Sequence, residues 1–196
     1  MKVLVIGATG TLGSAVVRAL REASHEVVEA ARSGPVKVDL EEPSDLDALF
    51  AGAGDLDALV CCAANGPLVD LETIGDEEFA AGLRGKLLGQ TALVRRAVHH
   101  LKDGASLTLT GGGFAAPQVA GGALGALINQ GLEGFVRVAS AELPRGLRLN
   151  LVSPGWISET LTAIGLDPAE GTPADEVARA YLELVEGTAR GRIVRP

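Results

Sequence analysis

The sequence is poor in cysteine and in aromatic side chains: its 196 residues include 2 Cys, 1 Trp, 1 Tyr and 4 Phe. Cys61 and Cys62 are adjacent, and neighbouring residues of a strand point to opposite faces, which argues against a disulfide between them. Unpaired cysteines are typical of a cytoplasmic protein, which is the location we expect. The apolar run at residues 3–6 is too short for a signal peptide or a membrane span, so we expect no membrane partner.

Basic residues are also scarce, since 17 Lys and Arg face 25 Asp and Glu, giving a formal net charge of −8. This balance excludes a broad nucleic-acid-binding surface, which needs a basic face. A small phosphate ligand needs only backbone N–H groups and a local positive charge, so it remains open. No histidine has partners at metal-ligand spacing, and we therefore expect no metal site.

Glycine is abundant, with 26 residues, and short apolar runs alternate with longer stretches at helical spacing. This alternation predicts a Rossmann-type α/β fold, a doubly wound parallel β-sheet with helices on both faces in three α/β/α layers. No linker or repeat interrupts the chain, so we expect one dinucleotide-binding domain over residues 1–196. The predicted strands are 3–6, 26–30, 36–38, 59–62, 106–110, 147–152 and 192–194. The predicted helices are 11–21, 44–51 (N-capped by Ser44), 76–101, 122–143 and 174–186, and residues 154–173 are expected to be irregular.

A glycine-rich segment directly follows the first predicted strand and opens the first helix. In this position the pattern is typical of a loop that binds a pyrophosphate against a helix N-terminus. The alternative is a βα turn that uses glycine only for its dihedral angles. The expected cofactor-binding residues here are Gly7, Ala8, Thr9, Gly10, Thr11, Leu12 and Gly13.

The end of the second strand carries Arg32 and Ser33, where dinucleotide folds that bind NAD(H) place an acidic residue. An arginine fork matches a 2′-phosphate, so the sequence favours NADP(H) as the cofactor. A solvated surface arginine is the alternative.

The chain resembles the short-chain dehydrogenase/reductase family over nearly its whole length. The glycine loop, the Val38-Asp39-Leu40 segment, residues 60–64, the Asn150–Gly155 segment and the helix around Glu133 and Glu142 carry the similarity. The resemblance implies a nicotinamide dinucleotide, a small-molecule substrate, and pairing of the two long helices in a homodimer or homotetramer. It also implies further cofactor contacts at Asp39, Leu40, Cys62, Ala63, Ala64, Lys86, Pro154, Gly155, Trp156 and Ile157.

The chain departs from the family at the residues that carry the chemistry. The family's Ser falls at Gly112 or Gly113, its Tyr at Gly125, its Lys at Asn129 and its Asn at Lys86. Tyr181 lies too far along the chain, in the last predicted helix, to replace the missing tyrosine.

Three residues are candidates for the remaining chemistry. Lys86 and Asn129 have exchanged positions relative to the family, and Lys86 is a candidate proton donor if the two meet near the nicotinamide ribose. The alternative for Lys86 is ribose binding or a salt bridge. Thr110 ends a strand and is a candidate to bind a substrate oxygen, or else is a sheet-end threonine without chemistry. The first hypothesis is an NADP(H)-dependent oxidoreductase acting on a small carbonyl or alcohol. The others are a non-catalytic NADP(H) sensor or regulatory protein and a structural subunit that binds no dinucleotide.

Overall fold

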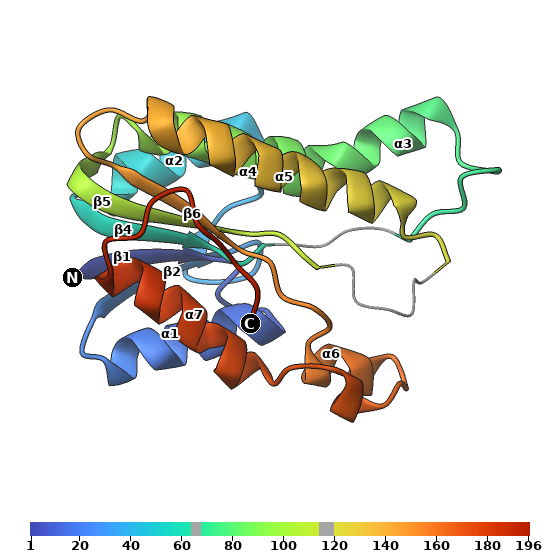
Figure 1. Cartoon of the computed structure of the whole chain (residues 1–196). Coiled ribbons are helices and arrows are strands. Elements are labelled where there is room, and N and C mark those ends of the chain that lie inside the picture. Colours follow the sequence, from blue (N-terminus) through green and yellow to red (C-terminus); the bar gives the residue numbers. More distant parts are fainter. Residues whose placement is uncertain (64–67, 114–119) are drawn as a thin grey trace.

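The computed structural model describes residues 1–63, 68–113 and 120–196, and these build a parallel seven-stranded sheet between two layers of helices (Figure 1). The strand order is β3-β2-β1-β4-β5-β6-β7. This order places β2 and β4 on opposite sides of β1, which is the predicted doubly wound arrangement. The strands are β1 (Lys2–Ile6), β2 (Glu26–Ala31), β3 (Val36–Lys37), β4 (Leu56–Cys61), β5 (Leu101–Thr110), β6 (Arg148–Val152) and β7 (Ile193–Val194).

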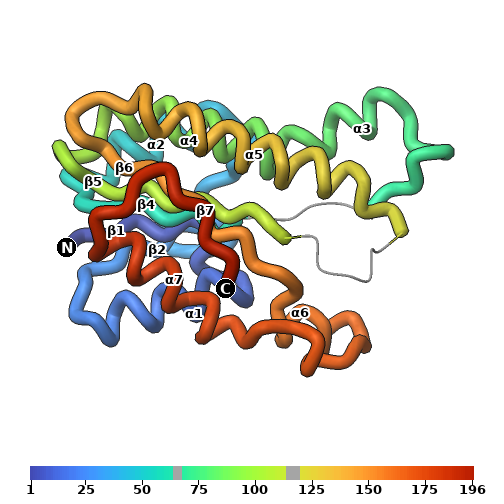
Figure 2. The backbone as a smooth tube through the Cα atoms, viewed as in Figure 1, coloured from blue at the N-terminus to red at the C-terminus, as the bar shows by residue number. Residues whose placement is uncertain are grey.

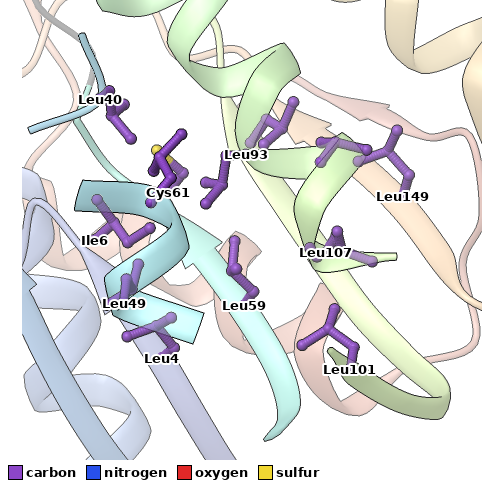
Figure 3. Packing of buried hydrophobic residues seen from close by; sticks show 14 of the residues in the cluster. Leu4, Ile6, Leu40, Leu49, Leu59, Cys61, Leu93, Leu101, Leu107 and Leu149 are labelled. Atoms are coloured by element: carbon purple, nitrogen blue, oxygen red, sulfur yellow. The ribbon is translucent and has the colours of Figure 1, made fainter. Parts of the chain in front are cut away.

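Helices cover both faces of the sheet, α2, α4 and α5 on one face and α1 and α7 on the other (Figure 1). Successive side chains of a strand point to two apolar cores, the first under α2, α4 and α5 and the second under α1 and α7. Leu4 therefore lies in the first core and Val5 in the second. Figure 3 shows leucines of the sheet and of the first layer in contact. The helices are α1 (Thr11–Glu22), α2 (Pro43–Ala53), α3 (Asp76–Leu83), α4 (Gly89–Ala97), α5 (Ala123–Glu142), α6 (Ser158–Ala163) and α7 (Ala174–Glu186), with a π-helical segment η1 (Arg84–Leu88) and a 3₁₀ turn η2 (Pro168–Glu170).

The prediction of one helix over residues 76–101 is wrong in two respects. The helix contains the π-helical segment η1, and it ends at Ala97. A turn follows, and Leu101, predicted as a helical core residue, instead begins β5 and pairs with Leu56. An apolar residue at this position satisfies either structure, so spacing alone did not separate them.

Two smaller predictions are also corrected. Pro43 occupies the first turn of α2 and Glu42 precedes it, so Ser44 lies inside the helix rather than at its N-cap. Residues 154–173 are partly regular, because they contain α6 and η2. Ile157 and Thr172 form an isolated parallel bridge that closes this excursion.

The helical excursions α3 and α6 lie beyond the carboxyl ends of the strands, on opposite sides of the sheet (Figure 2). In open parallel sheets, ligands bind outside these carboxyl ends, where neighbouring strands continue in opposite directions. A ligand site is therefore expected among the loops that follow β1, β2, β4, β5 and β6.

Candidate functional site

The loop between β1 and α1 is closely packed backbone. Gly7 has a φ of +80°, and a Cβ on Gly13 would stand 1.9 Å from the Gly7 carbonyl oxygen. The Gly10 N–H donates to that same oxygen at 3.0 Å, which closes the turn. The first turn of α1 has neither a side-chain cap nor an acidic residue, so it presents positive potential and N–H groups to an anion.

The loop lies at the point where β1 and β4 part. The Cys62 N–H donates to the Ile6 carbonyl at 2.7 Å, and a Cβ on Gly7 would stand 2.7 Å from the Ala63 nitrogen. The predicted residues after β4 therefore form a wall against the glycine loop. Ala64, another predicted contact, lies outside the described residues.

The segment after β2 forms the next wall. Arg32 and Ser33 are exposed, and Arg32 makes no ion pair with any residue in the described part of the chain. Gly34 approaches the Thr9 methyl group, since a Cβ on Gly34 would stand 3.9 Å from it. The end of β2 thus borders the glycine loop, and the Arg32 side chain is available to a ligand bound there.

Asp39 and Leu40 have structural contacts of their own. The Asp39 carboxylate accepts from the Glu41 N–H at 3.0 Å, and the Asp39 N–H donates to Asp45 Oδ2 at 3.0 Å. Leu40 is buried in the first core, where its Cβ would lie 2.7 Å from a Cβ on Gly89. The absence of a side chain at Gly89 therefore lets the start of α4 pass directly over residue 40.

This close passage positions Lys86, which the π-helical segment carries. Lys86 is only 8% exposed, and its Nζ donates to the Gly111 carbonyl at 2.9 Å. From the opposite helix, α5, the Asn129 amide fills the space beside the next residue, because a Cβ on Gly112 would stand 2.8 Å from Asn129 Nδ2. The side chains of Lys86 and Asn129 therefore converge on adjacent residues at the end of β5.

The electrostatics of this pair are unusual. Burial lowers the pKa of Lys86 from 10.5 to about 8, and the nearby Cys61 opposes part of that effect. Asn129 Oδ1 is buried without a hydrogen-bond partner among the described residues. An amine that titrates near neutral pH can both donate and accept a proton, and an unpartnered amide can bind a polar ligand group.

Thr110 does not reach this space. Its side chain is 2% exposed, and Oγ1 contacts the Cys61 carbonyl at 2.5 Å and the Tyr181 hydroxyl at 2.6 Å. The partners of its hydroxyl are the Cys61 carbonyl in β4 and the Tyr181 hydroxyl in α7, so Thr110 is not available to bind a substrate oxygen. The expectation that Tyr181 lies far from this region is also corrected, because its hydroxyl forms a hydrogen bond with Thr110 at the end of β5.

Gln90 is a site residue that the sequence reasoning missed. It is fully buried, and its amide accepts from the Thr110 N–H at 3.1 Å and donates to the Thr110 carbonyl at 2.9 Å. A polar residue on the apolar side of a predicted helix was the available signal, because a buried amide requires specific partners.

The segment after β6 completes the edge. Pro154 is buried, while Gly155, Trp156 and Ile157 are half-buried. The Pro154 carbonyl accepts from the Gly113 N–H at 2.6 Å, which joins this segment to the glycines after β5. The predicted residues at 154–157 therefore lie beside the Lys86 and Asn129 region.

The cysteines have little thiolate character. Burial raises the pKa of Cys61 to about 12 and also raises that of Cys62. Within the described ranges, no group of His, Cys, Asp or Glu residues could hold a metal ion. None of the helices in the described chain has the length and apolar character needed to cross a membrane.

Comparisons with known proteins agree with this architecture. The family model described as enoyl-(acyl carrier protein) reductase matches residues 7–188. The protein lin1944 from Listeria innocua has 35% sequence identity and a TM-score of 0.92, with 100% of this chain and 98% of that chain covered. No curated protein matches the chain.

Two further solved structures share the fold at lower identity. A small-chain dehydrogenase in complex with NADPH is 22% identical, with a TM-score of 0.84 and coverage of 100% of this chain and 96% of its own. A short-chain dehydrogenase/reductase from Serratia marcescens BCRC 10948 is 19% identical, with a TM-score of 0.84 and coverage of 100% and 95%. Since the family model spans most of the chain and the glycine loop occupies its expected place, the chain belongs to the short-chain dehydrogenase/reductase family.

Proposed function

We propose that the protein is an NADP(H)-dependent oxidoreductase that acts on a small carbonyl or alcohol. The observation that carries this proposal is the convergence of Lys86 and Asn129 on Gly111 and Gly112. This convergence lies at the same edge of the sheet as the glycine loop. A dinucleotide-binding loop and a proton-transferring group are the two components that carbonyl reduction requires.

The residues present fit the dinucleotide. The uncapped N-terminus of α1 and the close approach of Gly7 and Gly13 leave only backbone on the surface that would meet the pyrophosphate. Arg32, exposed at the end of β2, would bind the 2′-phosphate that distinguishes NADP(H) from NAD(H). A structural neighbour was solved in complex with NADPH, which supports NADP(H) as the cofactor proposed here.

The bound nicotinamide would supply or accept the hydride. Lys86 would supply the proton to the substrate oxygen, either directly or through a water, because its pKa of about 8 keeps both protonation states accessible near neutral pH. Asn129 would orient the ligand with the amide that has no partner for Oδ1 in the described structure.

One observation favours a second function, the binding of NADP(H) without hydride transfer. Gly125 stands where the family carries its tyrosine, and among the described residues outside its own helical turn no atom lies within 4 Å of the position that its Cβ would take. Under this second function the protein would sense or regulate through the dinucleotide.

One experiment separates the two functions. Purified protein is titrated with NADPH while the fluorescence of Trp156 is followed, and it is then incubated with NADPH and a panel of aldehydes and ketones. Substrate-dependent loss of NADPH absorbance, abolished in Lys86→Ala but retained in the exposed-lysine control Lys37→Ala, supports the oxidoreductase. Binding without turnover, with Lys86→Ala altering affinity alone, supports the sensor. The absence of binding to either reduced or oxidised nicotinamide dinucleotides refutes both.

We further propose that the protein forms a homodimer or homotetramer and that it is located in the cytoplasm. Leu127 and Val138 on α5 are large apolar side chains that are 49% and 64% exposed, which is consistent with a helix that packs against a second copy. Light scattering of the full chain measures this assembly.

A further inference from the structure

The strands β4 and β5 separate before their carboxyl ends. Their last paired residues are Val60 and Thr108. The Cys62 N–H donates to Ile6 in β1, so the Cys61 carbonyl on the other side of that peptide faces β5. The Gly111 N–H donates to Val152 in β6, so the Thr110 carbonyl and N–H face β4. These groups face the gap between the strands but do not pair with one another.

Side chains satisfy the separated groups in place of the ladder. The Gln90 amide takes both main-chain groups of Thr110, which would otherwise bond to two residues of a neighbouring parallel strand. The Cys61 carbonyl accepts a hydrogen bond from Thr110 Oγ1 at 2.5 Å. Since a carbonyl can only accept, the single hydroxyl proton of Thr110 is committed to it.

That commitment fixes the direction of the contact with Tyr181. The Tyr181 hydroxyl must donate to Thr110 Oγ1, at 2.6 Å, and Thr110 must donate to Cys61. Tyr181 is fully buried, and burial raises its pKa well above its usual value of 10, so the phenol keeps the proton that it donates. We call the Gln90 amide and the Tyr181–Thr110–Cys61 chain the β4–β5 clasp.

We propose that Gln90, Thr110 and Tyr181 are positioning residues that fix the distance between the two walls of the site. One wall, after Cys61, adjoins the glycine loop, and the other, after Thr110, begins with Gly111, which holds Lys86. Three successive glycines have little intrinsic preference for one conformation, so their placement depends on the residue that precedes them. This role rests on the proposed function, in which dinucleotide and substrate meet between these walls.

The strand supplies a matched control. Thr108 and Thr110 are two residues apart on one strand and both are buried, but the Thr108 hydroxyl has no hydrogen-bond partner among the described residues. Thr108→Val removes a hydroxyl outside the clasp, and Thr110→Val removes one inside it. Thr110→Ser retains the hydroxyl, and Tyr181→Phe removes only the donor.

The test is amide hydrogen exchange on the ligand-free full chain, followed by NADPH titration of the same variants. In Tyr181→Phe and Thr110→Val, exchange at Gly111 and Gly113 is expected to rise about tenfold, with Leu107 unchanged, because loss of one net hydrogen bond frees the strand end alone. NADPH affinity is expected to fall several-fold in the same variants. Thr108→Val and Thr110→Ser are expected to match the wild type in both measurements.

Two results would overturn the positioning role: unchanged exchange at Gly111 and Gly113 in Tyr181→Phe, or an increase spread evenly along β5, which marks a purely structural bond. If wild-type protein binds no dinucleotide but its variants show the local exchange pattern, the proposed function fails and the clasp stands. If binding is intact and equal in all variants, the clasp fails and the proposed function stands.

Discussion

The buried ammonium of Lys86 lowers the free energy of unfolding by an amount that depends on pH, and we call this amount its cost. Its pKa falls from 10.5 to about 8 on folding, so the unfolded chain binds more protons between these values and stability rises with pH there. At 1.36 kcal/mol per pKa unit, the cost at pH 7 is about 3 kcal/mol. By pH 9.5 the unfolded chain has lost part of its advantage, and the cost falls by about 2 kcal/mol.

Lys86→Met removes this term while keeping the length of the side chain. Urea unfolding at several values from pH 7 to 9.5 gives the free energy of unfolding of wild type and variant. The raised pKa values of Cys61, Cys62 and Tyr181 make both proteins less stable as pH rises above about 9, so only the difference between the two curves isolates Lys86.

We expect the variant to gain stability relative to the wild type at pH 7, and this gain to shrink by about 2 kcal/mol by pH 9.5. The exposed lysine control, Lys37→Met, is expected to follow the wild type at every pH. Parallel curves for Lys86→Met and wild type would refute the claim that the amine is held in a desolvated site. They would also remove the basis for proton transfer by Lys86 near neutral pH.

Three further predictions concern the ligand and the glycines. Arg32→Asp is expected to weaken NADPH binding at least tenfold, because one charge-assisted hydrogen bond is lost, while NADH binding changes little; an unchanged NADPH/NADH ratio in Trp156 fluorescence titrations would refute the 2′-phosphate contact. Gly13→Ala would place a Cβ 1.9 Å from the Gly7 carbonyl and is expected to abolish dinucleotide binding and to lower stability by about 1–3 kcal/mol. Its control, Gly52→Ala, places a Cβ with no described neighbour within 4 Å at an exposed position of α2 and is expected to stabilise the protein slightly in the same urea assay. The combined variant Lys86→Asn, Gly125→Tyr and Asn129→Lys is expected to reduce carbonyls with NADPH at least tenfold faster than wild type; a folded variant with no gain would show that the missing side chains are not what limits turnover.

Local pattern predicted most of the fold. Short apolar runs that alternate with helical spacing predicted the strands, and the glycine loop was identifiable because a strand precedes it and a helix follows it. The π-helical segment could not be predicted, since Leu83, Leu87 and Leu88 continue helical spacing through it. The segment passes close to Leu40 and Glu41, which Gly85 and Gly89 permit, and this tertiary contact is not readable from local spacing.

The site was predicted in part for the same reason. Lys86 and Asn129 were identified because a resemblance supplied the positions at which they differ, and the structure brings them to adjacent residues. The roles of Thr110, Gln90 and Tyr181 depend on contacts between residues 20 to 71 apart in sequence. The spacing of apolar residues predicts which face of a helix or strand is buried. It does not predict which residue, distant in sequence, contacts a side chain on that face.

The departures from the family pattern depend on one another physically. A serine at position 112 would bring its Cβ to 2.8 Å from the Asn129 amide, so the Asn129 side chain would have to move to accommodate it. Lys86 occupies the interior on the other side of the same segment and holds the Gly111 carbonyl. An apolar residue at position 86 would avoid the cost of about 3 kcal/mol that the buried ammonium imposes. A cost of that size, placed beside an unpartnered amide at the end of β5, supports the ligand-binding role that we propose for this edge of the sheet.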